Sequence, residues 1–440
     1  MNLIDKIAEK THLLGATLLI SVVLGPAVAY GSIYLFHIVL AALIFIVAFN
    51  HDLRTLFLSI LKKPLNTIFL ILLFWLTISI LWAENTSYAL THVIQFTMGL
   101  LVIMFCQVFI DSIATFKFHK NNILFPLLLV VLAIGLLESF TDFRWPISSI
   151  SYHNELFGRE NVVVENLKTE RIAGYLLASP TAFFWNPNHL AVFLCFFIPF
   201  FMKRKWINYL LFVISVVVIT QTGSRLTSIA LAAILMLFSF INRQNIRFLL
   251  LYLATLFLPM MFFASSLLAI KANEPLEKIT GVHVLSKVCI ICPDSFYLPD
   301  DNDNSQSVRR QLYAQGFQYL KDSRFLGVGA GNAEWLNYKQ REKTNNVTSV
   351  HFYWLELLIN GGVVLGILVL LYFSKMYVDL WKIRKNQITQ YFLMALTLFG
   401  LAVISLSSAH YFLPYYAFLG LLSAWINLNT QNDETNAVAG

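Results

Sequence analysis

Two stretches, LLFVISVVVITQTGSR at residues 210–225 and HFYWLELLINGGVVLGILVLLYF at residues 351–373, decide the fold. Each belongs to an apolar segment of about the 20 residues that a helix needs to cross a hydrocarbon core roughly 30 Å thick. A helix satisfies its own backbone hydrogen bonds, so in lipid such segments predict transmembrane α-helices. Each stretch also places one polar residue, Arg225 or His351, at the edge of its segment.

The composition extends this prediction to the whole chain. Of the 440 residues, 58% are hydrophobic and only 12% are charged, and 38 are Phe. An ordinary globular domain has about 25% charged residues. We therefore expect an all-α polytopic membrane protein. The first apolar run continues into the second without a convincing small-residue cleavage site, so no cleaved signal peptide is expected. The twelve expected spans are 13–29, 32–49, 67–82, 90–110, 123–140, 187–202, 207–222, 226–241, 248–270, 351–373, 391–408 and 411–427.

The distribution of Lys and Arg orients the expected spans. The short loops after even-numbered spans carry nearly all the Lys and Arg of the short loops, and Arg225 is the exception after an odd span. The positive-inside rule therefore places the even loops and both termini in the cytoplasm. The net charge of +7 largely reflects this asymmetry. No basic stripe interleaved with aromatic residues stands on a soluble surface, so nucleic-acid binding is not expected.

The domain organisation follows from the same pattern. Residues 1–270 hold spans one to nine with a periplasmic loop at 141–186. Residues 271–350 form a large periplasmic loop that contains short helices, because Leu312, Tyr319 and Leu320 recur at helical spacing. Residues 351–428 hold spans ten to twelve, and residues 429–440 form a cytoplasmic tail that we expect to be disordered.

Sequence motifs for cofactors are absent from the chain. It contains no GxxxxGK[ST], no GxGxxG between a strand and a helix, and no HExxH. The GVGAGN run at 327–332 is expected to be a turn with positive φ angles. The DDNDN run at 300–304 lacks the spacing and final Glu of an EF-hand loop, so a solvated loop tip is favoured there. We expect no cofactor and no metal.

The four cysteines fall into two pairs. Cys106 and Cys195 lie within expected spans and are interpreted as packing residues. Cys289 and Cys292 form CIIC in the large loop, where such a pair can be a disulfide, a redox site or half of a zinc site. No second pair with zinc spacing follows. A local disulfide is preferred because a periplasmic loop lies in an oxidising compartment.

The residues to which a binding or catalytic role can be assigned lie at the outer face of the expected membrane bundle. Arg225 stands against the topological bias for positive charge, and Arg309, Arg310 and His351 lie in or beside the large loop. The structural alternatives are a snorkelling Arg, exposed basic residues on a surface helix, and an interfacial core His. The functional interpretation is that guanidinium groups grip a diphosphate with bidentate contacts while a neutral His accepts a proton from a hydroxyl.

Several motifs, taken in order, resemble the O-antigen ligase and polymerase superfamily of bacterial inner-membrane glycosyltransferases. The resemblance covers about residues 75–425. It implies a GT-C-like helical fold and metal-independent, inverting transfer of a glycan from undecaprenyl diphosphate. The motifs are SILWAENTSYAL at 79–90, RIAG at 171–174, FFWNPNHLA at 183–191, TQTGSR at 220–225, RRQLYAQGFQYLKDSRFLGVGAGN at 309–332 and the HFYWLELLINGG run that begins at 351.

The resemblance also implies roles for individual residues. Arg225 and Arg309 match the positions that hold the diphosphate, with Arg310 as the alternative to Arg309, and His351 matches the position at the acceptor. The family often has Asn after the His and an acid later in the helix, where this chain has Phe352 and Asn360. This departure leaves the acceptor contacts open.

Four functional hypotheses follow. The preferred one is an O-antigen ligase that transfers a glycan to lipid A-core at the periplasmic face of the bacterial inner membrane. A polymerase would use a second lipid-linked glycan as the acceptor, and a protein O-oligosaccharyltransferase is a lesser variant. A lipid or polysaccharide transporter is the alternative from another class, although the chain shows no obvious inverted repeat and few charges within its spans.

Overall fold

The computed structural model describes residues 3–109, 124–141, 143–146, 151, 153–158, 179–201, 206–241, 305–344, 347–406 and 408–438. Within these residues the protein is a helical bundle with one two-stranded hairpin. The elements are α1 (Leu3–Leu24), η1 (Gly25–Ala27), β1 (Ala29–Tyr30), β2 (Ile33–Tyr34), α2 (Leu35–Phe49), α3 (His51–Leu61), α4 (Pro64–Ile78), η2 (Ser79–Trp82), α5 (Thr86–Phe109), α6 (Leu124–Phe140), η4 (Asn154–Phe157), α9 (Pro187–Phe201), α10 (Trp206–Gln221), α11 (Arg225–Ile241), α14 (Ser305–Asp322), α15 (Asn332–Lys339), η8 (Arg341–Thr344), α16 (Tyr353–Lys382), α17 (Gln387–Ala402), η9 (Val403–Ser405), η10 (Ala409–Tyr411) and α18 (Leu413–Val438).

Helices coincide with every expected span except 248–270, which lies outside the described residues. By length and composition, three helices within the described ranges can cross a membrane: Pro64–Trp82, Thr86–Phe109 and Tyr353–Lys382. The bent pair α2 and α3 makes a fourth if it counts as one span. The all-α membrane class is confirmed, and the number of twelve spans stays a prediction.

Two segments differ from the expectation. The chain turns by 105° after α2 and continues as α3, where the sequence analysis expected a cytoplasmic loop. The Asn50 side chain accepts a hydrogen bond from the Leu53 amide at 3.0 Å and so caps α3. At the other end of the chain, α18 runs to Val438, through most of the expected disordered tail. Extending an existing helix is much easier than nucleating one, which accounts for this continuation.

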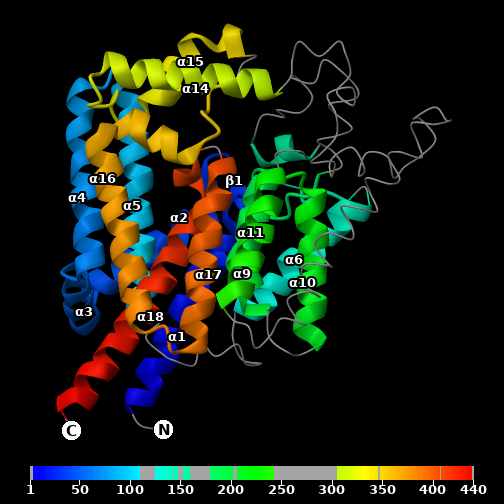
Figure 1. The fold of residues 1–440 in the computed structure, drawn as a ribbon. Coiled ribbons are helices and arrows are strands. Elements are labelled where there is room, and N and C mark those ends of the chain that lie inside the picture. Colours follow the sequence, from blue (N-terminus) through cyan, green and yellow to red (C-terminus); the bar gives the residue numbers. More distant parts are fainter. Residues whose placement is uncertain are drawn as a thin grey trace, which may run out of the picture.

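The helices that carry the two defining stretches pack on different partners: α10 packs against α6 and α9, and α16 packs against α4. The other large contacts join α18 to α5, and α17 to α9 and α11. Figure 1 shows α14 and α15 lying across one end of the bundle, above α4, α5 and α16. Both chain ends lie at the opposite end of the bundle (Figure 1). The described part of the large loop therefore forms a helical cap over this end of the bundle.

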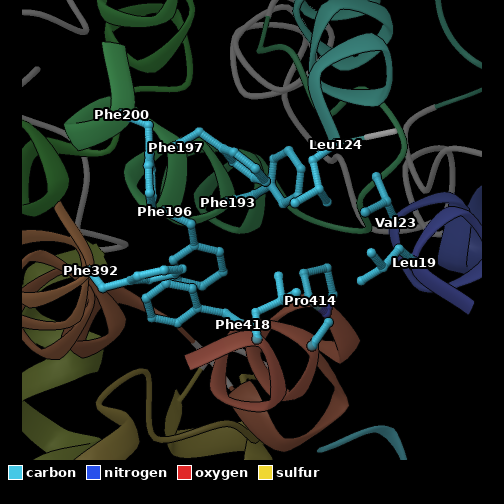
Figure 2. A pocket seen from close by; sticks show the side chains of 12 residues that line it. Leu19, Val23, Leu124, Phe193, Phe196, Phe197, Phe200, Phe392, Pro414 and Phe418 are labelled. Carbon is cyan, nitrogen blue, oxygen red and sulfur yellow. The ribbon is translucent and has the colours of Figure 1, made fainter. Parts of the chain in front are cut away.

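Aromatic packing joins α9 to α17 and α18. The rings of Phe196 and Phe418 stack with centroids 4.3 Å apart. Figure 2 shows these rings and Phe392 on one side of a small apolar pocket, with Leu19 and Leu124 across from them. The pocket is lined by apolar side chains, so it serves packing and offers no group for catalysis. Cys106 and Cys195 are buried and do not form a disulfide, as expected of packing residues, whereas Cys289 and Cys292 lie outside the described residues.

Candidate functional site

A break in α16 receives the glycine-rich loop that follows α14. Gly362 has φ 68° and ψ −168°, a conformation that only glycine adopts readily. The Val328 amide donates to the Ile359 carbonyl at 2.8 Å, and the Val363 amide donates to the Phe325 carbonyl at 3.0 Å. A Cβ on Gly327 would lie 2.4 Å from the Gly362 nitrogen, so the two backbones touch directly. The predicted positive φ angles in 327–332 are confirmed at Gly327, Gly329 and Gly331.

The SILWAEN run at 79–85 holds this loop from the other side.

 Trp82 Nε1 donates to the Gly327 carbonyl at 3.1 Å, and the Ala330 amide donates to Ser79 Oγ at 2.9 Å. The Asn332 side chain accepts from the Asn85 amide at 2.7 Å and donates to the Asn85 carbonyl at 3.1 Å. Two motifs that are distant in the sequence therefore form one clamp between η2, α5 and the loop before α15.

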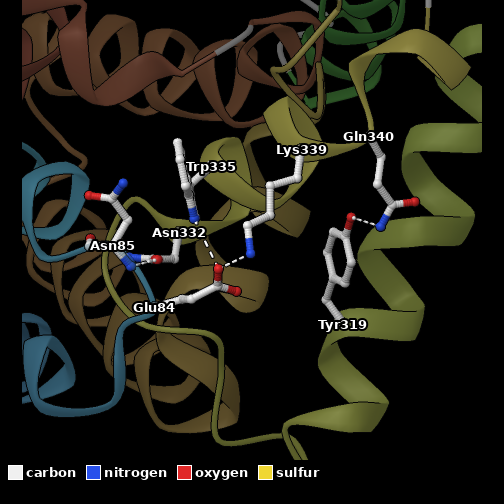
Figure 3. Close-up of polar contacts among 7 residues, drawn as sticks. All are labelled: Glu84, Asn85, Tyr319, Asn332, Trp335, Lys339 and Gln340. Atoms are coloured by element: carbon white, nitrogen blue, oxygen red, sulfur yellow. Dashed lines mark hydrogen bonds and ion pairs between the residues drawn. The ribbon is translucent and has the colours of Figure 1, made fainter.

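An exposed polar group completes the outer edge of the clamp. Glu84 accepts hydrogen bonds from Lys339 and, at 3.3 Å, from Trp335 Nε1 (Figure 3). The hydrogen bond from Lys339 is the main reason that the pKa of Glu84 lies below its usual value. Both side chains of this ion pair are about half exposed, so solvent screens it and it contributes little to stability.

His351 lies where α14 meets the start of α16. Its φ is 53°, which is unusual for a residue other than glycine and places strain at a candidate site. The Tyr313 hydroxyl of α14 donates to the His351 carbonyl at 3.4 Å. The Nδ1 atom of the half-buried ring is buried and has no hydrogen-bond partner among the described residues. The hydrogen-bonding capacity of this nitrogen is therefore unused by the described residues.

Arg309 of α14 is the predicted site residue that the structure brings to His351. Burial, and then the positive charge of Arg309, lower the pKa of His351 to about 4. At pH 7 the imidazole is therefore neutral and can accept a proton. Arg309 and its neighbour Arg310 are both exposed. Arg309 forms no ion pair with another described residue, so its exposed guanidinium can bind an anion beside the neutral imidazole.

Arg225 is the first residue of α11. The turn before it contains Gly223, which has φ 70°, and a hydrogen bond of 2.7 Å joins the Ser224 and Thr227 hydroxyls. The TQTGSR motif therefore begins a helix at Arg225. The side chain of Arg225 lies outside the described part of the structure, so its convergence with Arg309 and His351 stays a prediction.

Two other motif residues have structural contacts. The Asn360 side chain accepts from the Ala333 amide at 3.0 Å, which ties α15 to α16. Asn360, where the family often has an acid, therefore has a structural contact in this protein. Asn186 accepts from the Asn188 amide at 2.8 Å and so caps α9, which begins at Pro187. The RIAG motif at 171–174 lies outside the described residues.

The sequence analysis did not single out Glu356, although it stands within the apolar stretch that begins at His351. The structure buries this carboxylate on α16, where it accepts from the Ser408 amide at 3.1 Å and lies 3.5 Å from His410 Nδ1. An ionisable residue inside an apolar run is a functional candidate by default, so this signal was available in the sequence. Its partners were not, because they come from other helices.

An apolar pocket of about 410 Å³ opens between α16 and α17. Its lining begins at Trp354, three residues after His351, and continues to Tyr377 on the same helix. Leu396 and Gly400 of α17 form the other wall. The pocket has almost no polar surface, so it suits a hydrocarbon chain and no polar ligand.

Comparison with known proteins finds one family and one relative. Residues 210–371 match the family model described as O-antigen ligase. The chain is also 23% identical, over 387 residues, to the teichuronic acid biosynthesis protein TuaE of Bacillus subtilis (strain 168), an alignment that covers 82% of this chain and 72% of that protein. The resemblance to the O-antigen ligase and polymerase superfamily is confirmed, and the matched stretch contains Arg225, Arg309, Arg310 and His351.

Proposed function

We propose that this membrane protein of the O-antigen ligase and polymerase type transfers a glycan from undecaprenyl diphosphate to an acceptor hydroxyl. The transfer takes place at the periplasmic face of the bacterial inner membrane, and lipid A-core is the preferred acceptor. The observation that carries the proposal is the pairing of Arg309 with a neutral His351, whose Nδ1 is unoccupied by any described side chain. Both residues lie within the stretch that matches the O-antigen ligase model.

The proposed reaction is a single displacement. The acceptor hydroxyl attacks the anomeric carbon, the bond from that carbon to the diphosphate oxygen breaks, and the configuration inverts. The diphosphate leaves with the bonding electrons, while His351 accepts the hydroxyl proton. Arg225 and Arg309, or Arg310, stabilise the charge that develops on the leaving group, as preorganised cations do. Guanidinium groups supply this charge themselves, so the proposed step requires no metal or other cofactor at the diphosphate.

The donor itself would prepare His351 to act as a base. In the free protein the pKa of His351 is about 4, which makes the imidazole a weak base. A bound diphosphate places negative charge beside the ring and neutralises Arg309, and both effects favour the protonated imidazole. The pKa therefore rises toward the working pH when the donor is present, where a general base is most efficient.

The apolar pocket between α16 and α17 supports a lipid donor. A polyprenyl chain is hydrocarbon throughout, and this pocket has an apolar lining that starts beside His351. Burying such a chain would be favourable by roughly 25 cal/mol per Å² of apolar surface. We propose that the first part of the polyprenyl chain lies against Trp354 and Phe373, with the diphosphate at the end of the bundle that α14 covers.

Substitutions in purified protein test this assignment. Transfer is measured with a lipid-linked glycan donor, and donor binding is measured separately. Arg225→Ala and Arg309→Ala should weaken donor use, and Lys at either position should restore little because it lacks the bidentate fork. His351→Ala should abolish transfer while donor binding persists. Arg384→Ala, at the other end of α16, is the matched control. Near-normal transfer by well-folded His351→Ala protein would refute the assignment of His351 as the general base.

A topology reporter tests the orientation independently. α14 and α15 lie at the end of the bundle opposite both chain ends, which supports an extracytoplasmic position for the large loop (Figure 1). A reporter fused at Asn304 should therefore read periplasmic, and fusions at the termini should read cytoplasmic. A cytoplasmic signal from Asn304 would overturn the periplasmic site.

A polymerase is the second candidate function. The observation in its favour is the similarity to TuaE, which is named for teichuronic acid biosynthesis and not for O-antigen ligation. A knockout examined on a lipopolysaccharide gel separates the two. Loss of all polymer from lipid A-core, with lipid-linked polymer retained, identifies the ligase. Core carrying a single repeat unit identifies the polymerase. Glycan on proteins would indicate the oligosaccharyltransferase, and normal polymer with altered transport would indicate a transporter.

A further inference from the structure

Three buried side chains from different elements meet behind the start of α16. His92 comes from α5, Glu356 from α16 and His410 from η10, and one ligand atom of each lies within 4.8 Å of the others. Their exposed fractions are 1%, 4% and 2%. The two imidazole rings have centroids 4.2 Å apart, and His410 Nδ1 lies 3.5 Å from Glu356 Oε1. The cluster is fully enclosed.

The hydrogen-bonding capacity of this cluster is mostly unused. His92 Nδ1 and Nε2, and His410 Nε2, are buried without a partner among the described residues. Each buried polar atom left unsatisfied costs about 1–3 kcal/mol. Even a neutral imidazole has one donor and one acceptor nitrogen, so both nitrogens of His92 lack the hydrogen-bond partner that each requires. Three such atoms in one cluster leave donor and acceptor capacity that a bound group would satisfy.

We propose that His92, Glu356 and His410 bind one divalent transition metal ion, of which Zn²⁺ is the representative. Two imidazoles and one carboxylate are a donor set of three-ligand zinc sites. Bonds of about 2.1 Å place the ligand atoms of a tetrahedral site roughly 3.4 Å apart, so the His410–Glu356 separation needs almost no adjustment. The proposal revises the sequence-based expectation of no metal, because ligands that lie so far apart in the chain leave no spacing motif.

The local charge also suits a cation. Glu356 supplies one negative charge, and Glu334 of α15 lies close enough to interact with it electrostatically. Among the described residues, no Lys or Arg forms an ion pair with Glu356. Buried charges in proteins are paired or coordinate a metal, and a divalent ion would balance both carboxylates. The buried ring of Phe96 packs against both imidazoles and limits access of water, which strengthens this attraction.

The metal would act as a structural tie beneath the proposed active site. It would join α5, α16 and η10, and thereby hold the first turn of α16, which follows His351 directly. Ser408, just before η10, already joins two of these elements, since its amide donates to Glu356 of α16 and its hydroxyl lies 3.4 Å from that of Ser349. None of the three ligand residues is a proposed diphosphate contact, so the proposal does not depend on the identity of the glycan acceptor.

Metal content tests the proposal directly. The full chain is purified with a tag that contains no histidine, treated with a chelator, re-equilibrated with Zn²⁺, and freed of excess metal. We expect about one Zn²⁺ per chain, with water in the fourth position that three protein ligands leave open. Cobalt substitution should give the intense visible spectrum of a four-coordinate ion. His92→Gln and His410→Gln should each lower the affinity by more than the roughly 10–100-fold that outer-shell substitutions cost.

His189→Gln is the matched control, because His189 is a buried histidine of α9 outside the cluster. It should keep the metal content of the unsubstituted chain. If the ligand variants do not fold, the unsubstituted chain provides the test. Zn²⁺ added after chelation should raise its thermal unfolding midpoint, and Mg²⁺ should not. Folded, unsubstituted protein that takes up no stoichiometric Zn²⁺, or a cobalt spectrum unchanged in His92→Gln, would overturn the site. Neither readout depends on transferase activity, so this failure is distinct from that of the proposed function.

Discussion

Replacing Gly362 by Ala should destabilise the protein through the contact between α16 and the glycine-rich loop. The φ and ψ of Gly362, 68° and −168°, lie in a region that is essentially restricted to glycine. An Ala there would cost about 1–3 kcal/mol in backbone strain. A Cβ would also lie 2.3 Å from the carbonyl carbon and oxygen of Leu326, which are backbone atoms and cannot rotate away. Such overpacking costs a further ~1–3 kcal/mol.

The two costs add to about 2–6 kcal/mol of unfolding free energy, since they arise from different interactions. The expected result is a clear drop in the denaturation midpoint of detergent-solubilised protein, followed by tryptophan fluorescence. Transfer per folded molecule should also fall, because the loop at Leu326 positions the segment of α16 that follows His351.

Gly400→Ala is the matched control. A Cβ at Gly400 meets nothing within 4 Å, and the residue lies inside α17. Alanine is favoured over glycine in a helix interior by about 1 kcal/mol, so this variant should be as stable as the unsubstituted protein or more stable. If Gly362→Ala and Gly400→Ala unfold at the same midpoint, the backbone contact at the break does not hold the loop and the reasoning is refuted.

Three further predictions concern the clamp and the candidate base. Asn332→Ala removes three hydrogen bonds from a fully buried side chain and should lower the unfolding free energy by about 2–4 kcal/mol, measured by the same denaturation; an unchanged midpoint would contradict the clamp. Lys339→Ala should leave stability essentially unchanged in that assay, because its ion pair with Glu84 is exposed to solvent. The acid limb of the kcat/KM profile should lie near pH 4, where protonation of His351 removes the free base. Arg309→Gln should move this limb to higher pH, because losing a positive charge stabilises the imidazolium; a limb near pH 6.5 in both proteins would argue against their contact.

Local signals in the sequence predicted most of the individual elements. The apolar segments became helices because their length and hydrophobicity are properties of contiguous residues. The same is true of α14, whose Leu312 and Leu320 are buried at helical spacing, and of the positive φ angles in the GVGAGN turn. The start of α9 at Asn186 and Pro187 is likewise set by neighbouring residues. Each of these features depends on interactions within a few residues.

Contacts between distant segments were decided by the tertiary structure alone. The GG pair at 361–362 is visible in the sequence, but only the folded protein shows that its backbone meets Leu326. The α3 helix appeared where charged residues suggested a loop, because an amphipathic segment takes its conformation from the surface on which it lies. In the sequence, His92 and His410 are single histidines in apolar stretches. Only the packing of the bundle places them beside Glu356. The spacing of residues along the chain does not predict such contacts, because the contacts depend on how whole helices pack.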